Sequence, residues 1–392
     1  MDAKARTLDP ANAIASHPDW RIEYSLLMAA ARMDLSSTQL TTLFEQTKGQ
    51  VNWHHTLSLA ASHGITPLLY QAVQGVPTVP NEVQDRLHRV YMGIAQKNMW
   101  LTAELLALID RFAAQGIILV PYKGPILAQM AYDNLSLREF KDLDVLVREN
   151  DVHKAQTLLV DQDFYPWKAP APEDAETAFR KRPVQRFIHR QRPIAVDLHW
   201  GATYKRSFDF PFKDEQFWRR LQTFSMSGRN IQVVPPEEML QFLCLHGSRH
   251  QGERLIWIRD VAQFVHAHPH MAWDRCLTLA TQAGNQRMLL IGLQLAHDLM
   301  GIDLPASVHA AIQSNPLVAS LVRPIWDRWL FRPAATGIVH KLSVHRYLIQ
   351  IHGRWQDRVP VFIDSLLGTP WRWIGALPDR LSARAGSRPS HE

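Results

Sequence analysis

The sequence predicts an α+β fold, in which a core with a mixed sheet is flanked by N-terminal helices and a C-terminal helical domain. Two patterns predict it: helical periodicity at both ends of the chain, and short apolar runs between residues 116 and 200. The expected divisions are a flexible leader, an N-terminal helical region, the core, the helical domain and a flexible tail, at residues 1–19, 20–80, 81–234, 235–375 and 376–392.

The first helices are predicted between residues 20 and 75, where apolar side chains recur at helical spacing. Asp34 and Ser36 lie between the first two segments, and side chains of this kind cap helices. A longer amphipathic helix is expected over residues 81–115, because Gly116 is suited to terminate it.

Strands are predicted where short apolar runs are bounded by turn residues. Two buried strands are expected at residues 117–124 (IILVPYKG) and 141–147 (KDLDVLV), each followed by a helix. Two further strands joined by a tight turn are expected at residues 184–193 and 194–200.

From Pro235 onward the pattern is almost entirely helical. The segments predicted as amphipathic helices are residues 237–250, 255–268, 273–284 and 287–301. Gly284 and Gly301 are expected at helix ends.

Composition excludes some classes of protein without selecting one. The 392 residues carry 43 Lys and Arg against 37 Asp and Glu, a net charge of +6, which favours anionic partners without indicating nucleic-acid binding. Cys244 and Cys276 lack the spacing of a zinc or disulfide motif, so we expect buried thiols. No secretory signal or apolar run of about 18 residues is present, so a cytoplasmic protein without a membrane span is expected.

Acidic side chains interrupt two of the predicted strands. Asp142 and Asp144 share one face of the strand at residues 141–147, because side chains alternate along a strand. The same alternation places Asp197 and His199 on one face of the later strand. Buried carboxylates are costly unless neutralised, and Mg²⁺ prefers carboxylate oxygens. If the strands are neighbours, the three aspartates are expected to be catalytic residues and to share two metal ions roughly 4 Å apart.

A glycine turn precedes the aspartates. Lys123 and Gly124 follow a predicted buried strand and open a helix, a context in which backbone N–H groups and the helix N-terminus bind phosphate. Pro125 removes one donor from this turn. Alone, a Lys-Gly pair is a weak signal, and a simple turn is the commoner explanation.

These residues form a pattern typical of one protein family: Lys123-Gly124, Arg138, DLDVLV at residues 142–147 and VDLHW at residues 196–200. The chain resembles the uncharacterised nucleotidyltransferases of bacteria, a family that is similar to the DNA polymerase β-like nucleotidyltransferase superfamily. The resemblance covers roughly residues 90–310, including the helical region downstream of the core.

The resemblance implies transfer of a nucleoside monophosphate from a nucleoside triphosphate, such as ATP, to an unknown acceptor, with release of pyrophosphate. It implies Mg²⁺ or Mn²⁺ bound by Asp142, Asp144 and Asp197. The acceptor would be a small molecule, peptide or polymer, as in bacterial natural-product or polysaccharide biosynthesis, and nucleic acid is not expected. The usual Gly-Ser of the superfamily is Gly124-Pro125 here, which lacks a phosphate-binding hydroxyl.

Other basic residues are candidates for nucleotide binding. With Lys123, Gly124 and His199, we expect Arg138 and Lys141 to bind the triphosphate, although both could instead balance the acidic cluster. The basic stretch at residues 180–192 could guide an anionic substrate, but a solvated hairpin edge is the commoner explanation.

His246 and His250 lie four residues apart and share a predicted helix face. That spacing can bind zinc, but no third ligand is evident, so a position lining the cleft is preferred over a zinc site. Arg259 is a further candidate for contact with phosphate or acceptor, and the partner of Asp260 stays open.

Two other hypotheses remain beside the enzymatic one. A catalytically inactive nucleotide-binding protein would explain the missing Gly-Ser hydroxyl, but the intact aspartates oppose it. A helical scaffold would use the Trp-rich helices to bind a partner enzyme, and loss of Asp144 would leave its cellular role unchanged.

Overall fold

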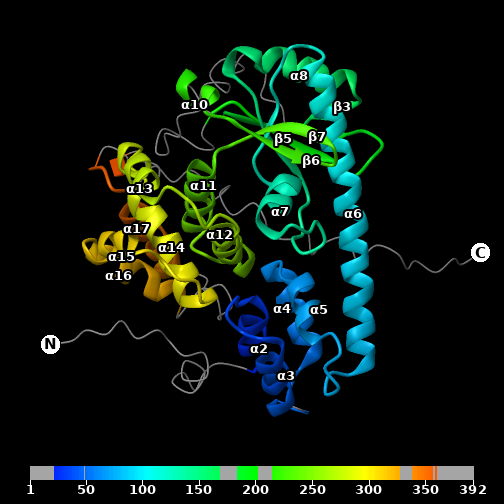
Figure 1. Ribbon diagram of the computed structural model, residues 1–392, viewed down its shortest axis with the longest axis vertical. Coiled ribbons are helices and arrows are strands. Elements are labelled where there is room, and N and C mark those ends of the chain that lie inside the picture. Colours follow the sequence, from blue (N-terminus) through cyan, green and yellow to red (C-terminus); the bar gives the residue numbers. More distant parts are fainter. Residues whose placement is uncertain are drawn as a thin grey trace, which may run out of the picture.

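The computed structural model describes residues 22–47, 49–167, 183–201, 214–326, 338–355 and 358–359. Within them, a five-stranded mixed sheet and a separate two-stranded hairpin are surrounded by helices, which confirms the α+β class (Figure 1). The predicted leader and tail lie outside the described residues. Figure 1 shows the N-terminal helices at the opposite end of the molecule from the sheet.

Helices begin the described chain, as predicted. They are α2 (Ile22–Ala31), α3 (Ser37–Gln46), α4 (Trp53–His63) and α5 (Thr66–Val73). Ser36 caps α3 in a capping box: its hydroxyl accepts a hydrogen bond from the backbone of Gln39, whose side chain accepts one from the backbone of Ser36. The cap predicted at Ser36 is confirmed, whereas Asp34 forms an ion pair with Arg32.

One long helix, α6 (Asn81–Ala113), connects the N-terminal helices with the sheet, and its bounds agree with the prediction (Figure 1). Its first half packs on α5. Its second half buries Leu101, Leu105, Leu108 and Phe112 in a core shared with the sheet. The helix therefore supports one face of the sheet that carries the aspartates.

The sheet has the strand order β1-β2-β5-β4-β3. The strands are β1 (Val120–Pro121), β2 (Leu143–Leu146), β3 (Phe164–Pro166), β4 (Val184–His189) and β5 (Ala195–His199). β2 and β5 are parallel, while the other pairs are antiparallel. β1 is shorter than predicted, and its Pro121, which has no N–H to donate, lies on an edge strand, where proline is tolerated.

Helices α7 (Gly124–Tyr132) and α8 (Val152–Asp161) follow β1 and β2. A short 3₁₀ turn, η1 (Glu149–Asp151), leads into α8. Pro125 lies in the first turn of α7, as predicted.

A hairpin that the sequence analysis missed follows the short helix α10 (Glu215–Arg219). Its strands are β6 (Gln222–Met226) and β7 (Arg229–Val233). Ser227 and Gly228 both have positive φ, at 50° and 75°, as a two-residue primed turn requires. The Ser-Gly pair between alternating polar and apolar residues was the available signal.

The four predicted C-terminal helices are confirmed as α11 (Pro236–Arg249), α12 (Leu255–Ala267), α13 (Trp273–Gln282) and α14 (Gln286–Met300). Gly284 and Gly301 lie at helix ends, as predicted. Three further helices follow: α15 (Ala306–Gln313), α16 (Pro316–Pro324) and α17 (Ile338–Gln350). Cys244 and Cys276 are buried as expected.

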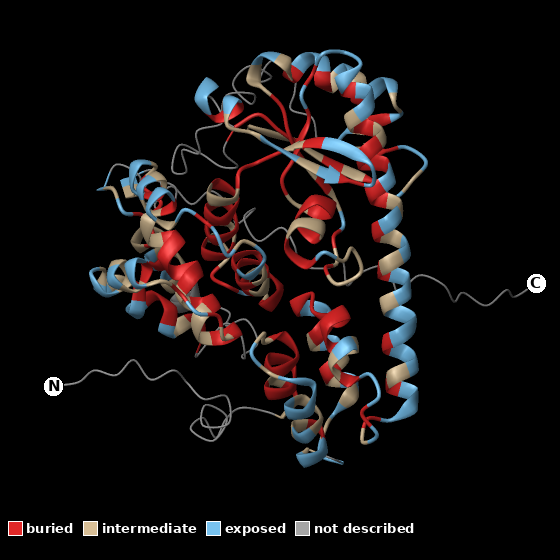
Figure 2. Ribbon diagram, viewed as in Figure 1, coloured by how far each residue is buried: buried red, intermediate tan, exposed pale blue. Residues whose placement is uncertain are grey.

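The largest core joins the two helical regions. Buried apolar side chains from α2, α5, α7, α11, α12 and α14 form one continuous cluster, visible as the red inner faces in Figure 2. The predicted division between N-terminal region, core and helical domain therefore stays a prediction. In the described ranges, no helix combines the length and apolar character needed to cross a membrane.

Candidate functional site

A row of charged residues crosses three strands of the sheet. Asp144 of β2 is in register with Asp197 of β5, and Asp197 is in register with Arg186 of β4. Residues opposite one another on neighbouring strands project from the same face, so these side chains form a line across it. The predicted adjacency of the two aspartate-bearing strands is confirmed.

Asp142 precedes β2 and joins this row through Arg186. Nη2 of Arg186 donates hydrogen bonds of 2.7 Å to Oδ2 of Asp142 and to Oδ2 of Asp197. Nε of Arg186 donates a third, also 2.7 Å, to Oδ1 of Asp197. One guanidinium therefore lies between the two carboxylates, which makes them close neighbours.

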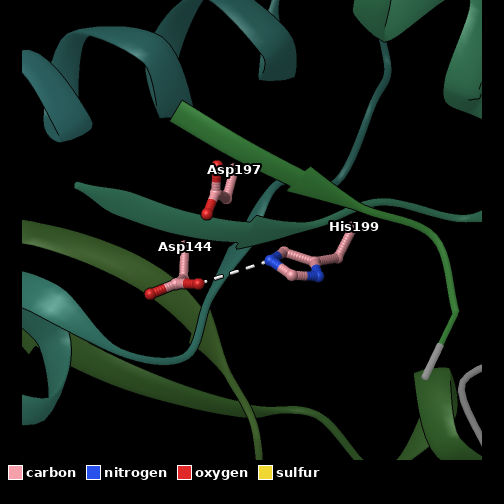
Figure 3. A group of neighbouring side chains, drawn as sticks. All are labelled: Asp144, Asp197 and His199. Carbon is pink, nitrogen blue, oxygen red and sulfur yellow. Dashed lines mark hydrogen bonds and ion pairs between the residues drawn. The ribbon is translucent and has the colours of Figure 1, made fainter. Parts of the chain in front are cut away.

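Among the residues that the structure describes, Asp144, Asp197 and His199 form a group of potential metal ligands (Figure 3). One donor atom from each lies within 4.8 Å of the others. Nε2 of His199 is 3.3 Å from Oδ1 of Asp144. Two carboxylates and an imidazole suit a divalent cation, with oxygen ligands favouring Mg²⁺ or Mn²⁺ and the nitrogen favouring transition metals. The residues therefore fit a cation, with His199 in the place where Asp142 was expected.

Asp144 lies among groups that stabilise its charge. Nζ of Lys123 is 3.6 Å from Oδ1 of Asp144, and the Tyr122 hydroxyl donates to the same oxygen at 3.4 Å. Lys123 also lies over the rings of Tyr122 and Phe242. The predicted lysine of the glycine turn thus contacts a predicted metal ligand directly.

Two aspartates of this cluster have pKa values shifted in opposite directions. Burial, and then the negative charges of Asp144 and Asp197, raise the pKa of Asp142 to about 6, against the opposing effect of Arg186 and Lys123. Burial also acts to raise the pKa of Asp144, but Lys123 and His199 outweigh it and hold that pKa well below its usual range. The cluster therefore retains negative charge at neutral pH.

The glycine turn lies against the segment that carries Asp142. Gly124 has φ of 54°, a left-handed conformation that other residues adopt only with strain. A Cβ at this position would lie 3.2 Å from the carbonyl oxygen of Asp142. Gly124 thus allows the N-terminus of α7 to approach the aspartates closely, whereas Pro125 contributes no N–H.

Arg138, expected near the triphosphate, lies in a buried ion pair instead. Its Nε and Nη2 donate to both carboxylate oxygens of Asp260 on α12, at 2.9 to 3.0 Å. Tyr132 donates to the same carboxylate at 2.8 Å. On the other side, Nδ2 of Asn98 on α6 donates to the backbone carbonyl of Arg138. These contacts fix the segment that leads from α7 into β2.

The other predicted residues differ in their surroundings. The Lys141 side chain is 71% exposed and lies 4.0 Å from Glu139, so it is accessible beside the aspartates. Arg259 donates to the backbone carbonyl of Ala31 and to Gln263, contacts that hold α12 against α2. A contact of Arg259 with phosphate or acceptor stays a prediction.

His246 and His250 pack together against Trp257, with ring centroids 4.9 to 5.0 Å apart. Burial, followed by Lys123, lowers the pKa of His246 well below its usual value. Burial, followed by Arg249, lowers the pKa of His250 to about 3. In the part of the chain that the structure describes, neither histidine belongs to a group of three potential metal ligands.

The predicted basic stretch has no single role. Residues 180–182 lie outside the described residues. Arg190 lies over the Tyr165 ring, and Arg192 forms an ion pair with Glu104 on α6. Arg186 alone of the three described arginines of this stretch contacts the aspartates.

Sequence reasoning missed two features of this site. His199 was grouped with nucleotide binding, yet it lies within the closest donor group. Arg186 was assigned to a solvated hairpin edge, although its alternation with the apolar Phe187 placed it on one strand face. A cross-strand register, which the sequence did not supply, was needed to find its partners.

Comparisons with known proteins identify a family but not a substrate. The chain matches a family model described as uncharacterised nucleotidyltransferase over residues 49–301. It has no match among curated proteins. It is similar to the crystal structure of an antigenic nucleotidyltransferase-like protein from Paracoccidioides brasiliensis, with 14% identity, covering 60% of this chain and 94% of that one, at a TM-score of 0.34, which carries no further argument. Since the family model matches more than half of the chain, the protein belongs to the family of uncharacterised nucleotidyltransferases.

Proposed function

We propose that the protein is a metal-dependent nucleotidyltransferase that moves a nucleoside monophosphate from a nucleoside triphosphate to an acceptor, releasing pyrophosphate. The observation that carries the proposal is the convergence of Asp144, Asp197 and His199 beside the Lys123-Gly124 turn. The acceptor class follows the sequence-based expectation of a small molecule, peptide or polymer in bacterial biosynthesis. The relationship to the polymerase β-like superfamily is part of the same proposal.

In this proposal, Asp142, Asp144 and Asp197 bind Mg²⁺ or Mn²⁺, with His199 as a further ligand. A divalent cation bound there would neutralise charge on the triphosphate and favour ionisation of the attacking hydroxyl. The three aspartates hold the reactants in line, and Asp197 accepts the proton of the acceptor hydroxyl as it attacks the α-phosphate. Asp197 is supported in this role by its position in the centre of the row.

Phosphate oxygens are proposed to bind at the N-terminus of α7. Lys123 supplies a positive charge and Gly124 allows close backbone approach. Lys141, which is exposed and precedes Asp142 in the chain, is proposed as a further phosphate-binding residue. For Arg138, expected to bind phosphate, we now propose a positioning role, because its guanidinium is committed to Asp260. By holding the segment before β2, Arg138 would orient Asp142 and Asp144.

A second candidate function is a nucleotide-binding protein without turnover. Pro125 favours it, since the turn has neither the hydroxyl of a Gly-Ser pair nor the N–H that other residues would supply. Such a protein would bind a nucleoside triphosphate with a metal ion but release no pyrophosphate.

The test is incubation of the full chain with each of four α-labelled nucleoside triphosphates, Mg²⁺ or Mn²⁺, and a cell extract. We expect label transfer from one donor, lost in Asp144→Asn and retained in Asp161→Asn, an exposed aspartate at the end of α8. Metal-dependent nucleotide binding without label transfer or pyrophosphate release would favour the second candidate. A chain that neither binds nor transfers nucleotide contradicts both.

A further inference from the structure

Arg186 occupies the part of the acidic cluster where positive charge is needed. Its guanidinium makes three hydrogen bonds of 2.7 Å, two to Asp197 and one to Asp142. A guanidinium matches paired oxygens as a planar fork, so it is a good counter-ion for two adjacent carboxylates. Arg186 therefore supplies positive charge at Asp142 and Asp197.

The arrangement differs from that of a permanent structural ion pair. The Arg186 side chain is 44% exposed and that of Asp142 is 32% exposed, whereas that of Asp197 is 17% exposed. Because the guanidinium already has access to water, it can leave the carboxylates at a lower desolvation cost than a fully buried arginine. Arg186 can therefore exchange the oxygens that it binds, which a fully buried ion pair cannot do.

Formal charges indicate what happens when ligands enter. Three carboxylates, those of Asp142, Asp144 and Asp197, face two cationic side chains, Lys123 and Arg186. A divalent cation at the carboxylates would compete with Arg186 for the same oxygens. A triphosphate would bring new paired oxygens to the same strand face, and these accept a guanidinium equally well.

We propose that Arg186 is a donor-binding residue: its guanidinium neutralises Asp142 and Asp197 when no cation is bound, and it moves to phosphate oxygens of the triphosphate when metal and nucleotide bind. Lys123 and Arg186 then hold phosphate oxygens from opposite ends of the row. This inference rests on the proposed nucleotidyltransferase function, and it assigns to Arg186 a specific part in binding the donor.

The test uses the full chain and two probes that do not depend on the identity of the base: Mn²⁺ alone, followed by electron paramagnetic resonance, and Mg²⁺ with tripolyphosphate, followed by calorimetry. In Arg186→Gln, we expect Mn²⁺ to bind about threefold to tenfold more tightly, because its competitor is gone. We expect tripolyphosphate to bind about tenfold more weakly at saturating Mg²⁺, because a charge-assisted contact is lost.

The opposite signs separate this role from a structural one. A destabilised site would lose affinity for both probes, and a solvated arginine would affect neither; either result overturns the inference. Arg190→Gln removes an equal charge from the end of the same hairpin and should change neither affinity. Arg186→Lys, which keeps the charge but not the fork, should fall between wild type and Arg186→Gln with Mn²⁺, and serves if Arg186→Gln fails to fold.

The two proposals fail in distinguishable ways. Wild-type protein that transfers no label in the assay above contradicts the proposed function, whatever Arg186 does. Wild-type protein that transfers label while Arg186→Gln keeps wild-type affinity for both probes contradicts only the role of Arg186. Wild-type protein that binds Mn²⁺ but not tripolyphosphate also overturns it.

Discussion

Two arginine–carboxylate clusters contact the segment that leads into β2, through Arg138 and through Asp142, yet they are built differently. Arg138 binds Asp260 through both carboxylate oxygens, and the two side chains are only 10% and 3% exposed. Arg186 binds Asp142 and Asp197 through hydrogen bonds of 2.7 Å, shorter than the 2.9 to 3.0 Å of the Arg138 cluster, but its side chain is 44% exposed. Hydrogen-bond length alone would rank the Arg186 cluster as the tighter one, whereas exposure shows that it is the more open to solvent.

The difference assigns the clusters different roles. Removing one partner of a buried ion pair leaves a buried charge and typically costs about 3–5 kcal/mol, whereas exposed pairs contribute roughly 0–1 kcal/mol. The Arg138 cluster therefore stabilises the junction of α7, β2 and α12. We propose that the Arg186 cluster opens to admit ligands.

The largest expected effect is on catalysis at the acidic cluster that Asp144 forms with Asp142 and Asp197. Asp144→Asn removes the charge of a proposed metal ligand but keeps its shape, so nucleotidyl transfer should fall by about 10²–10³-fold or more, the loss typical of one electrostatic contact to a transition state. The melting temperature should change less than in variants of Asp260. Transfer of labelled nucleotide and thermal unfolding monitored by circular dichroism measure the two effects. If Asp144→Asn keeps its transfer activity, the acidic cluster takes no part in catalysis.

The next largest effect is on the free energy of unfolding, through the buried Arg138–Asp260 ion pair. Arg138→Met leaves the Asp260 carboxylate buried without its ion-pair partner, so the free energy of unfolding should fall by about 3–5 kcal/mol. The double variant Arg138→Met with Asp260→Leu should recover much of this loss, because no unpaired charge remains. Urea denaturation measures both. A loss below about 1 kcal/mol in the single variant would show that the Arg138–Asp260 ion pair contributes no more to stability than an exposed ion pair does.

Burial also predicts how acid acts on the helical core. Burial, followed by the charge of Arg254, lowers the pKa of His63 from 6.5 to about 4, and the backbone N–H of Leu255 donates to its Nδ1. As the pH falls below 6.5, the unfolded chain takes up a proton before the folded one, so this contribution to stability is complete above that pH. It is lost towards pH 4, by up to about 2–3 kcal/mol.

Urea denaturation at several pH values tests this, with His63→Gln as the comparison variant. The wild-type free energy of unfolding should decline more steeply between pH 6.5 and 4 than that of the variant. Parallel curves would show that His63 keeps its ordinary pKa in the folded protein.

The smallest expected effect completes the comparison. Arg186→Met should lower the free energy of unfolding by less than Arg138→Met does, since the Arg186 side chain is 44% exposed and its carboxylate partners are 32% and 17% exposed. Urea denaturation of Arg186→Met and Arg138→Met compares the same replacement of arginine by methionine at the two clusters. A loss as large as that of Arg138→Met would make Arg186 a structural residue and remove the exchange that we propose for it.

The sequence predicted features that depend on local pattern. Helix positions followed from apolar periodicity, and the shared face of Asp142 and Asp144 followed from strand alternation. The pairing of Arg138 with Asp260 did not, because 122 residues separate them and only the packing of α12 on α7 brings them together. The contact of Arg186 with Asp197 required the register of β4 on β5.

Two misses have similar causes. The hairpin of β6 and β7 was overlooked because each strand has one apolar face only, and its Met226 and Ile231 pack on α6 and α7, far away in sequence. The inclusion of His199 among the closest donors depends on how its ring turns toward Asp144, a side-chain orientation that strand alternation leaves open.

Anomalous diffraction from crystals soaked with Mn²⁺ and tripolyphosphate tests whether Asp144, Asp197 and His199 hold a divalent cation beside the phosphate-binding turn. We expect a manganese peak bonded to oxygens of Asp144 and Asp197, with phosphate oxygens at the N-terminus of α7. A peak elsewhere, or no peak with Arg186 still bound to Asp142 and Asp197 at saturating Mn²⁺, would contradict it.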